Sequence, residues 1–386
     1  MRFPQKLSAF IREYYDTDSS IPLHKPQFDD HEKDKVLDTI QSSFVSSVGV
    51  YVDEFEKKIS NYTGSCQTVA TVNGSSALYC ALYIAGVKPG DLVITQALTF
   101  VATCNAIAQL QASPIFIDVN RTSLGLCPFA LEDYLELNAM LDESGTCIHK
   151  VTQQVIRAAV PMHTFGHPAQ LDELVAVCNR WGLLLIEDAA ESLGSFYKGQ
   201  HTGTFGELAA LSFNGNKVIT TGGGGAILCR TTCLGARAKH LTTTAKIAHE
   251  YEYDHDELGF NFRMPNLNAA LGCAQISKLD RYVEIKRELA RDYQSFFQRT
   301  DYILVKEPEY AKSNYWLNAV ICPTKKLRDD LLEVTNSEGV MTRPVWRLMN
   351  HLPMYKNSLR GPLPISEWLS DCLVNLPSTP NLRQTV

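Results

Sequence analysis

Short apolar runs alternate with helical stretches along most of the chain from about residue 66. The run CQTVATV is typical of a buried strand, NGS of a turn, and SALYCALYIAG of a helix that ends at Gly86. The predicted strands DLVIT and SPIFIDV repeat this unit, with the predicted helix VATCNAIAQL between them. Strands that alternate with helices in this way indicate a layered α/β fold with a mainly parallel sheet.

Further apolar runs extend the predicted sheet toward the middle of the chain. We predict strands at VIRAAVPM and LLLIEDAA around a helix at LDELVAVCNRWG, and a strand pair at ELAALSF and GAILC, whereas the polar segment near 120–153 reads as a connection. Beyond about residue 265 the pattern changes to a long helical run, followed by a smaller mixture of strands and helices. We therefore predict a large domain over 1–265 with an N-terminal arm, and a smaller C-terminal α/β domain over 266–386.

Composition and charge narrow the class of protein. With 386 residues, 45% of them hydrophobic and 20% charged, the chain resembles an ordinary globular protein. A net charge of -6 and the absence of a basic run argue against a nucleic-acid partner. No signal segment or membrane-length apolar run occurs, so we expect no membrane contact. Eleven cysteines without a C-x-x-C spacing fit reduced thiols in a cytoplasmic protein better than a disulfide framework.

One acidic residue stands at the end of a predicted buried strand. Asp188, in LLLIEDAAES, occupies the carboxyl end of that strand, where open α/β sheets bind ligands. A simple helix cap is the alternative for a lone aspartate in this place. A buried carboxylate without a charged partner is costly, however, so something cationic should face it. A protonated heterocycle has the required charge.

One lysine stands alone in an apolar and small-residue segment. Lys217 lies in LSFNGNKVITTGGGGAI, after an apolar run and before four consecutive glycines. Most lysines are simply solvated at the surface, but an ammonium at or under the surface is poorly solvated. The neutral amine condenses with carbonyl compounds to form Schiff bases. The position therefore favours a lysine that reacts with an aldehyde.

A third element is the turn VNGSSA, residues 72–77, between a strand and a helix. Free backbone N–H groups at a helix N-terminus, with the hydroxyls of Ser75 and Ser76, form an anion site. An aldehyde for Lys217, a ring nitrogen for Asp188 and a phosphate for this turn occur together in pyridoxal phosphate, whose ring acts as an electron sink. The order of turn, acid and lysine is far more specific than any one of them.

Two histidines, His163 and His167 in PMHTFGHP, are four residues apart, a spacing that zinc helices use. The neighbouring prolines and Gly166 disfavour a helix here, so we expect no metal. His163 follows an apolar strand directly and is a candidate for lining the cofactor pocket, whereas His167 is expected to be structural.

Several longer blocks carry a resemblance to a known family. The chain resembles the DegT/DnrJ/EryC1/StrS sugar aminotransferases, which share the aspartate aminotransferase fold, fold type I of the pyridoxal phosphate enzymes. The likeness runs from about Pro22 to the C-terminus. It rests on VNGSSAL, TFVATCNAI, IFIDV, IEDAAESLGSFYKG, GTFGELAALSFNGNKVITTGGGGAI, ELGFNFRMPNLNAALGCAQ and TRPVW.

The resemblance implies roles for individual residues. Lys217 would bind the cofactor aldehyde and then move the proton between cofactor and sugar, and Asp188 would pair with the pyridinium. Glu191 stands where many members have glutamine near the ring hydroxyl. The other implied contacts are stacking on the ring by Phe100, for which core packing is the alternative, and phosphate binding by Gly74, Ser75 and Ser212.

The resemblance also implies an assembly. Asn261, in LGFNFRM, would reach the phosphate from a neighbouring subunit, because active sites in this family are built at a dimer interface. We therefore expect a homodimer with shared active sites. Chains of this group usually continue past PSTPNL into a last helix, so the smaller domain is expected to be shortened.

Four segments are similar in sequence to family members that act on UDP-4-keto-6-deoxy-N-acetylglucosamine. They are SFNGNKVITTGGGGAI, ESLGSFYKG, AKSNYWLNAV and TRPVW. Those members install a 4-amino group with glutamate as donor, on the way to sugars of the bacillosamine or legionaminic acid type. Arg343 is a candidate for binding the diphosphate or the donor carboxylate, since guanidinium suits both, with packing beside Pro344 as the alternative.

Other functions are also compatible with the sequence. A different dTDP- or GDP-linked keto sugar, or a non-catalytic nucleotide-sugar sensor of the same fold, would use the same scaffold. A dehydratase of this fold would have histidine in place of Lys217. An NTPase is disfavoured because GNK is not followed by serine or threonine and lacks the P-loop spacing.

Overall fold

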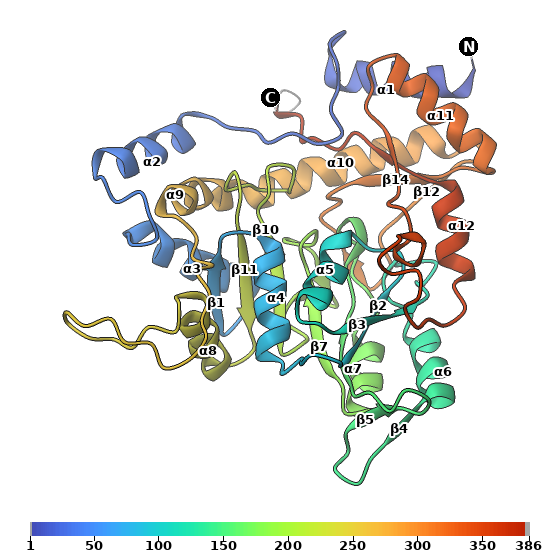
Figure 1. The fold of residues 1–386 in the computed structure, drawn as a ribbon. Coiled ribbons are helices and arrows are strands. Elements are labelled where there is room, and N and C mark those ends of the chain that lie inside the picture. Colours follow the sequence, from blue (N-terminus) through green and yellow to red (C-terminus); the bar gives the residue numbers. More distant parts are fainter. Residues whose placement is uncertain (1, 383–386) are drawn as a thin grey trace.

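The computed structural model describes residues 2–382 of the chain and is built around a seven-stranded sheet (Figure 1). The strand order is β1-β11-β10-β7-β6-β2-β3. The strands span β1 Gln67–Thr71, β2 Leu92–Gln96, β3 Ser113–Ile117, β6 Ile156–Val160, β7 Leu184–Asp188, β10 Leu208–Ser212 and β11 Gly225–Cys229. All seven coincide with predicted apolar runs. Strands buried on both faces have nearly continuous apolar sequences, which is why the sequence locates them well.

Six of the seven strands run in the same direction, and only β11 is antiparallel to its neighbours β1 and β10. The predicted mainly parallel sheet is therefore confirmed. In register, Gly225 at the start of β11 lies between Thr71 of β1 and Ser212 of β10, while Ala210 of β10 pairs with Asp188 of β7. The carboxyl ends of β1, β7 and β10 thus meet at one edge of the sheet.

Helices cover both faces of this sheet (Figure 1). One face packs against α4 Gly74–Ile84, α5 Val101–Gln109 and α8 Thr232–Thr242. The other packs against α3 Val50–Thr63 and α9 Asn266–Gln275, and, farther along, against α6 Pro128–Asn138 and α7 Leu171–Arg180. Helix α4 begins where the Asn73 side chain accepts from the Ser76 amide, and Gly86, with a φ of 79°, follows its end as predicted.

A second sheet of four strands lies at the other end of the chain, in the order β12-β14-β16-β15. Its elements are β12 Ile303–Leu304, β14 Asn318–Ile321, β15 Arg343–Pro344 and β16 Leu373–Leu376, with α10 Leu279–Phe297, α11 Lys325–Ser337 and α12 Pro364–Cys372. The first helix, α1 Phe3–Tyr15, shares an apolar cluster with α10 and this sheet and lies beside α11 (Figure 1). The N-terminal arm therefore packs on the smaller unit.

The predicted division at residue 265 places α9 with the smaller domain, but this helix packs on α3 and on α2 Asp30–Gln41 of the large one. The long helical run predicted after residue 265 consists of α9, a short 3-10 turn at Ile276–Lys278, and α10. The division itself stays a prediction. The final residues, which bear on the expected shortening of the smaller domain, lie outside the described residues.

The segment 120–153 differs from the prediction of a simple connection. It contains α6 and a hairpin of β4 Ala139–Leu141 and β5 Cys147–His149. Several apolar side chains of this segment are exposed, among them Phe129 and Leu137, so it lacks a clear period. Three short strands, β8 Phe196–Tyr197, β9 Gln200–His201 and β13 Ala311–Lys312, form a further small sheet. Within residues 2–382, no helix combines the length and the apolarity needed to traverse a membrane.

Candidate active site

Lys217 lies in the connection between β10 and β11, above the carboxyl edge of the sheet. Its side chain is 14% exposed, and its Nζ lies 3.5 Å from Oε1 of Glu191. The Trp316 ring covers the same nitrogen, with 3.9 Å between Nζ and the ring centroid. The single lysine of the glycine-rich segment is therefore enclosed by a carboxylate and an aromatic ring, as its sequence context predicts.

Asp188 ends β7 at the same edge and is almost completely buried. Its Oδ2 accepts from the Thr103 hydroxyl at 2.7 Å, and its Oδ1 accepts from the Ala190 amide at 3.2 Å. In the described part of the chain no lysine, arginine or histidine forms an ion pair with it. An oriented carboxylate that lacks a cation suits a protonated ring nitrogen.

The turn before α4 forms the third side of the site. The backbone of Gly74 and Ser75 begins the helix, so its free amides and its positive dipole end face the edge of the sheet. The turn packs tightly on the neighbouring strand, because a Cβ added to Gly74 would lie 2.9 Å from Cβ of Ser212. The Ser212 hydroxyl therefore lies beside the helix end, and together they can bind an anion.

These groups surround one cavity of about 290 Å³. Lys217, Asp188, Glu191 and the α4 turn all line it, as does Phe100, whose side chain is half exposed. The whole lining is Asn73, Gly74, Ser75, Leu78, Phe100, Ala102, Met162, Asp188, Ala190, Glu191, Ser212, Asn214, Asn216, Lys217, Gly223, Gly224, Trp316 and Trp346. An amine, a carboxylate and an anion-binding helix end around one aromatic-walled cavity fit the aldehyde, ring nitrogen and phosphate of pyridoxal phosphate.

Glu191 is the second carboxylate of the cavity and is 3% exposed. Its Oε2 accepts from the Phe165 amide at 2.9 Å. Burial raises the pKa of Glu191 to about 7, an effect that Lys217 opposes and Asp188 reinforces. Phe165 donates from a left-handed backbone conformation, with φ of 57°, which is unusual for a bulky residue and marks a constrained segment.

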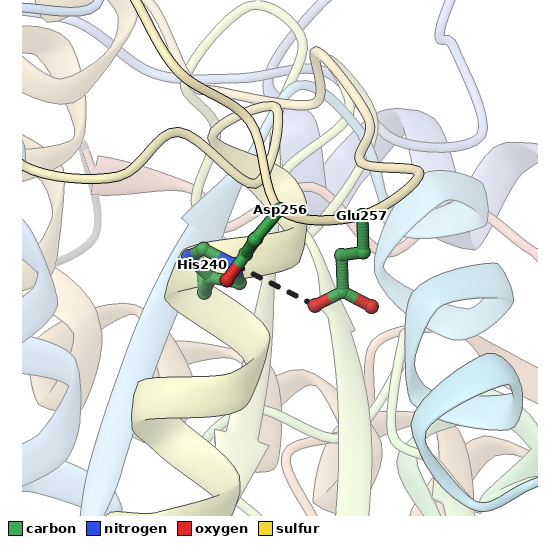
Figure 2. A group of neighbouring side chains, drawn as sticks. All are labelled: His240, Asp256 and Glu257. Carbon is green, nitrogen blue, oxygen red and sulfur yellow. Dashed lines mark hydrogen bonds and ion pairs between the residues drawn. The ribbon is translucent and has the colours of Figure 1, made fainter.

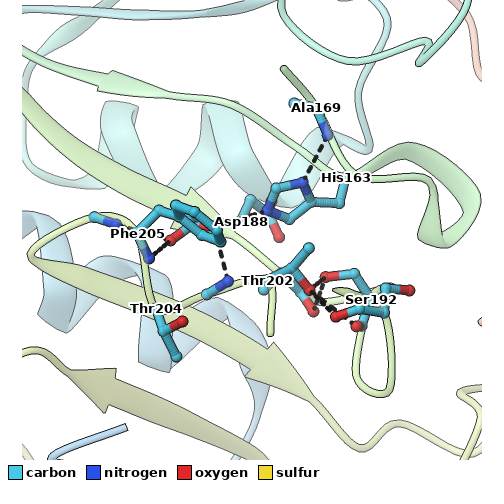
Figure 3. Close-up of polar contacts among 12 residues, drawn as sticks. His163, Ala169, Asp188, Ser192, Thr202, Thr204 and Phe205 are labelled. Atoms are coloured by element: carbon cyan, nitrogen blue, oxygen red, sulfur yellow. Dashed lines mark hydrogen bonds and ion pairs between the residues drawn. The ribbon is translucent and has the colours of Figure 1, made fainter. Parts of the chain in front are cut away.

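His163 does not line the cavity, although its neighbour Met162 does. Its Nδ1 accepts from the Ala169 amide at 3.2 Å, as Figure 3 shows, and its Nε2 lies 3.0 Å from Oε2 of Glu187. Because Nδ1 accepts, the ring proton is on Nε2 and is donated to Glu187. The ring thus lies on the buried side of the sheet edge, since successive side chains on a strand and its extension point in opposite directions.

Glu187 organises the loop that follows this edge of the sheet. It accepts from the amides of Gly203, Phe205 and Gly206 at 2.7–2.8 Å as well as from His163. Burial opposes its ionisation, but these hydrogen bonds, first that from His163, lower the pKa of Glu187 below its ordinary value. His163 is therefore part of the support beneath Asp188 rather than a cofactor contact.

Two further predicted residues lie outside the cavity of this chain. Arg343 is exposed on β15 and donates to Oδ1 of Asn336 at 2.8 Å. Asn261 is exposed in the segment after α8, where its Oδ1 accepts from Nε of Arg263 at 3.0 Å. Neither contributes to the site within one copy of the chain.

The cavity also contains residues that the sequence did not single out. Trp316 and Trp346 form an aromatic wall, and the Trp346 ring lies 6.1 Å from that of Phe100 and 5.3 Å from that of Phe165. Both tryptophans belong to motifs that carry the resemblance, AKSNYWLNAV and TRPVW. That membership was the only available signal, because their approach to Lys217 depends on packing between distant segments.

A separate polar cluster lies on α8 and the loop after it (Figure 2). His240, Asp256 and Glu257 could each offer a metal ligand atom. Nε2 of His240 already lies 2.7 Å from Asp256, and Arg237 pairs with both oxygens of Glu257. These groups form a charge network at the surface, apart from the cavity.

His167 is buried with an edge-to-face contact to Tyr315, and burial lowers the pKa of its ring to about 4, as expected for a structural histidine.

Comparisons with known proteins show the family and the fold. The GDP-perosamine synthase of Escherichia coli O157:H7 is 33% identical over 362 residues, which is 94% of each chain, and that of Vibrio cholerae is 31% identical over 94% of this chain and 95% of the relative. A DegT DnrJ EryC1 StrS aminotransferase from Brucella abortus has a similar solved structure, with a TM-score of 0.83, 26% identity and 92% of each chain covered. These neighbours confirm the predicted fold type I architecture. Residues 26–385 match the family described as DegT/DnrJ/EryC1/StrS aminotransferases. The chain therefore belongs to the DegT/DnrJ/EryC1/StrS aminotransferase family.

Proposed function

We propose that this protein transfers an amino group from glutamate to a nucleotide-linked 4-keto-6-deoxy sugar, with pyridoxal phosphate as cofactor. One observation carries the proposal: the amine of Lys217, the carboxylate of Asp188 and the N-terminus of α4 line the same cavity. Family membership supports the reaction class, and the cavity supplies a partner for each reactive group of the cofactor.

Bound pyridoxal phosphate supplies an aldehyde carbon and a ring that accepts electrons. Asp188, held by Thr103, would keep the ring nitrogen protonated, and Glu191 would face the ring hydroxyl. Gly74, Ser75 and Ser212 would hold the phosphate, and Phe100 would cover the ring. Lys217 would first hold the aldehyde and then carry a proton on Nζ. The Trp316 ring covers one side of that nitrogen.

The sugar substrate has two candidates. The resemblance of four motifs favours UDP-4-keto-6-deoxy-N-acetylglucosamine, whereas the names of the relatives in Escherichia coli and Vibrio cholerae favour a GDP-linked sugar. The aromatic wall of Trp316, Trp346 and Phe100 suits the apolar face and methyl group of a 6-deoxy sugar in either case. A panel of UDP-, GDP- and dTDP-linked 4-keto sugars, assayed for glutamate-dependent amino transfer, separates them by relative kcat/KM.

We further propose a homodimer with shared active sites. Exposed apolar side chains follow α2 and the segment after it, namely Leu37, Ile40, Phe44, Val48 and Val50. Exposed apolar side chains concentrated in one segment are typical of a protein–protein interface. Lys217 is the only cation in the described lining of the cavity, so a diphosphate needs further positive groups. The segment after α8 projects from the body of the molecule (Figure 1). Lys246 belongs to this segment, whereas Asn261 and Arg263 lie at its base, where they form bridges with Thr243 and with Thr71 of β1.

Subunit complementation tests the shared site. Asn261→Ala and Lys217→Ala are each expected to lose most activity as pure proteins. Mixed in equal amounts and reassociated, they should recover activity toward one quarter of the parent value. Half of the dimers are then mixed, and one of the two sites in each mixed dimer contains both residues. A mixture that stays inactive although mixed dimers form would contradict the sharing of sites by two copies.

The central experiment concerns the lysine. The parent protein with pyridoxal phosphate should absorb visible light and lose that band when glutamate is added. Lys217→Ala should show neither behaviour nor amino transfer, whereas the exposed control Lys198→Ala should match the parent. Full transfer by Lys217→Ala would refute the role of this residue. Binding of nucleotide sugar without any spectral change on addition of glutamate would favour the non-catalytic sensor.

A cytoplasmic location completes the proposal, in keeping with eleven free cysteines.

A further inference from the structure

Trp316 is the side chain in closest aromatic contact with the proposed reactive amine. It is fixed from two directions: its amide donates to Oδ1 of Asn314 at 2.8 Å, and its indole N–H donates to the carbonyl of Asn216 at 2.7 Å. The second bond ties the ring to the residue before Lys217. The carbonyl of Trp316 is its remaining backbone polar group, and it contacts the long helix α10.

That carbonyl accepts from Nζ of Lys286, at 3.1 Å. Lys286 lies on α10 and is 0% exposed, and its second acceptor is the carbonyl of Ser378. Among the described residues no carboxylate pairs with this amine, and burial lowers the pKa of Lys286 well below its ordinary value. Both ring nitrogens of the nearby His24 are also buried. Burial, followed by the charges of Lys286 and Lys217, lowers the pKa of His24 as well.

A buried lysine in such a place is a costly way to fill space. Methionine has a similar length and would avoid the desolvation of an amine. What the amine provides is a pair of N–H donors at the end of a long stem, which join α10 to two separate segments, at Trp316 and at Ser378. One of these segments carries the ring over Lys217.

We propose that Lys286 is a positioning residue of the active site, which holds the carbonyl of Trp316 and thereby keeps the indole over Nζ of Lys217. This inference rests on the proposed role of Lys217. An aromatic face stabilises a cation placed over it, so the indole favours the protonated form of the nitrogen at position 217. Loss of Lys286 should therefore disturb the ionisation of that nitrogen although Lys286 does not touch it.

The test measures the visible absorbance of the protein loaded with pyridoxal phosphate as a function of pH. Lys286→Met should lower the pH midpoint of the band by about half a unit or more, the size expected for a lost cation–aromatic contact. Trp316→Leu should lower it in the same direction. Lys286→Met added to Trp316→Leu should cause no further shift, since both changes remove one interaction.

Tyr293→Phe is the matched control. Tyr293 lies two turns farther along the same buried face of α10 and donates to the carbonyl of Pro377, at 3.0 Å, without touching Trp316. It should change the melting temperature but leave the midpoint in place. An equal midpoint shift in Tyr293→Phe, or an unchanged midpoint in Lys286→Met, would overturn the inference.

Two results separate this inference from the proposed function. If the parent protein forms no visible band, or if the band survives Lys217→Ala, the assignment of Lys217 fails and this inference with it. If the band depends on Lys217 but ignores Lys286, only the inference fails. Should Lys286→Met not fold, Lys286→Gln serves instead, because its shorter amide cannot span both carbonyls and should also lower the midpoint.

Discussion

Replacement of Glu191 by glutamine should change how the stability of the cofactor-free protein depends on pH. Burial raises the pKa of Glu191 to about 7, against an ordinary value of 4.5. A carboxyl group whose pKa is raised in the folded state binds its proton more tightly there than in the unfolded chain. Its contribution to stability is therefore fully present below about pH 4.5 and is lost as the pH rises toward 7.

The magnitude follows from this shift. One unit of pKa corresponds to about 1.4 kcal/mol, so the contribution lost between pH 5 and pH 8 is about 2 to 3 kcal/mol. Glutamine keeps an oxygen that accepts from the Phe165 amide but does not titrate. The free energy of unfolding of Glu191→Gln should therefore rise, relative to that of the parent, by this amount over the same range.

Urea unfolding followed by circular dichroism at several pH values measures the difference. Glu309→Gln, at an exposed position, is the control and should run parallel to the parent. A difference between Glu191→Gln and the parent that stays constant within about 0.5 kcal/mol from pH 5 to pH 8 would refute the assignment of a raised pKa to this carboxyl group.

Two further predictions concern the frame of the site. Gly225→Ala should lower the free energy of unfolding by about 2 kcal/mol or more, because the added Cβ would lie 2.4 Å from the backbone carbon of Asn73. Gly215→Ala, whose Cβ would meet nothing within 4 Å, should be nearly neutral; urea unfolding compares the two variants, and equal effects would contradict the steric argument. Thr103→Val removes the hydroxyl that donates to Asp188 at 2.7 Å and should weaken binding of pyridoxal phosphate about tenfold in an absorbance titration; unchanged affinity would show that this hydrogen bond does not orient the carboxylate.

The sequence predicts the elements of the fold where burial imposes a simple pattern. The strand containing Asp188 and the strand before Lys217 are buried on both faces, so their apolar runs are unambiguous. The turn at Gly74 is equally clear, because a strand, a capping asparagine and an apolar helix follow in order. The prediction for segment 120–153 was wrong because the apolar residues of its surface helix and hairpin, which are partly exposed, follow neither the helical nor the strand period.

Side-chain placement within the site was less predictable than its elements. His163 directly follows a strand, as an edge ligand would, but the adjacent Met162 faces the cavity and His163 faces Glu187. One residue of register decides between the two sides, and the sequence does not reveal it. Trp316 illustrates a second limit, since it reaches Lys217 from a distant segment of the chain. Contacts between segments so far apart depend on tertiary packing rather than on local pattern.

The topology explains why a lone lysine and a run of glycines stand together. Because β1 and β10 run parallel while β11 lies antiparallel between them, β11 must begin at the edge where the other two end. A reversal between adjacent antiparallel strands needs only a few residues, but the connection over 213–224 is much longer. The additional length carries Lys217 over that edge.

The position of β11 between β1 and β10 leaves no room for a side chain at its first residue, so only glycine fits there. Gly225 lies in register between Thr71 and Ser212, directly beneath the turn that precedes α4. Any side chain there would meet the backbone of Asn73 and force that turn away from the edge. With glycine, the N-terminus of α4 closes down beside the connection that carries Lys217. An anion at the helix end and a carbonyl carbon at the lysine can then belong to one small molecule, which neither feature would permit alone.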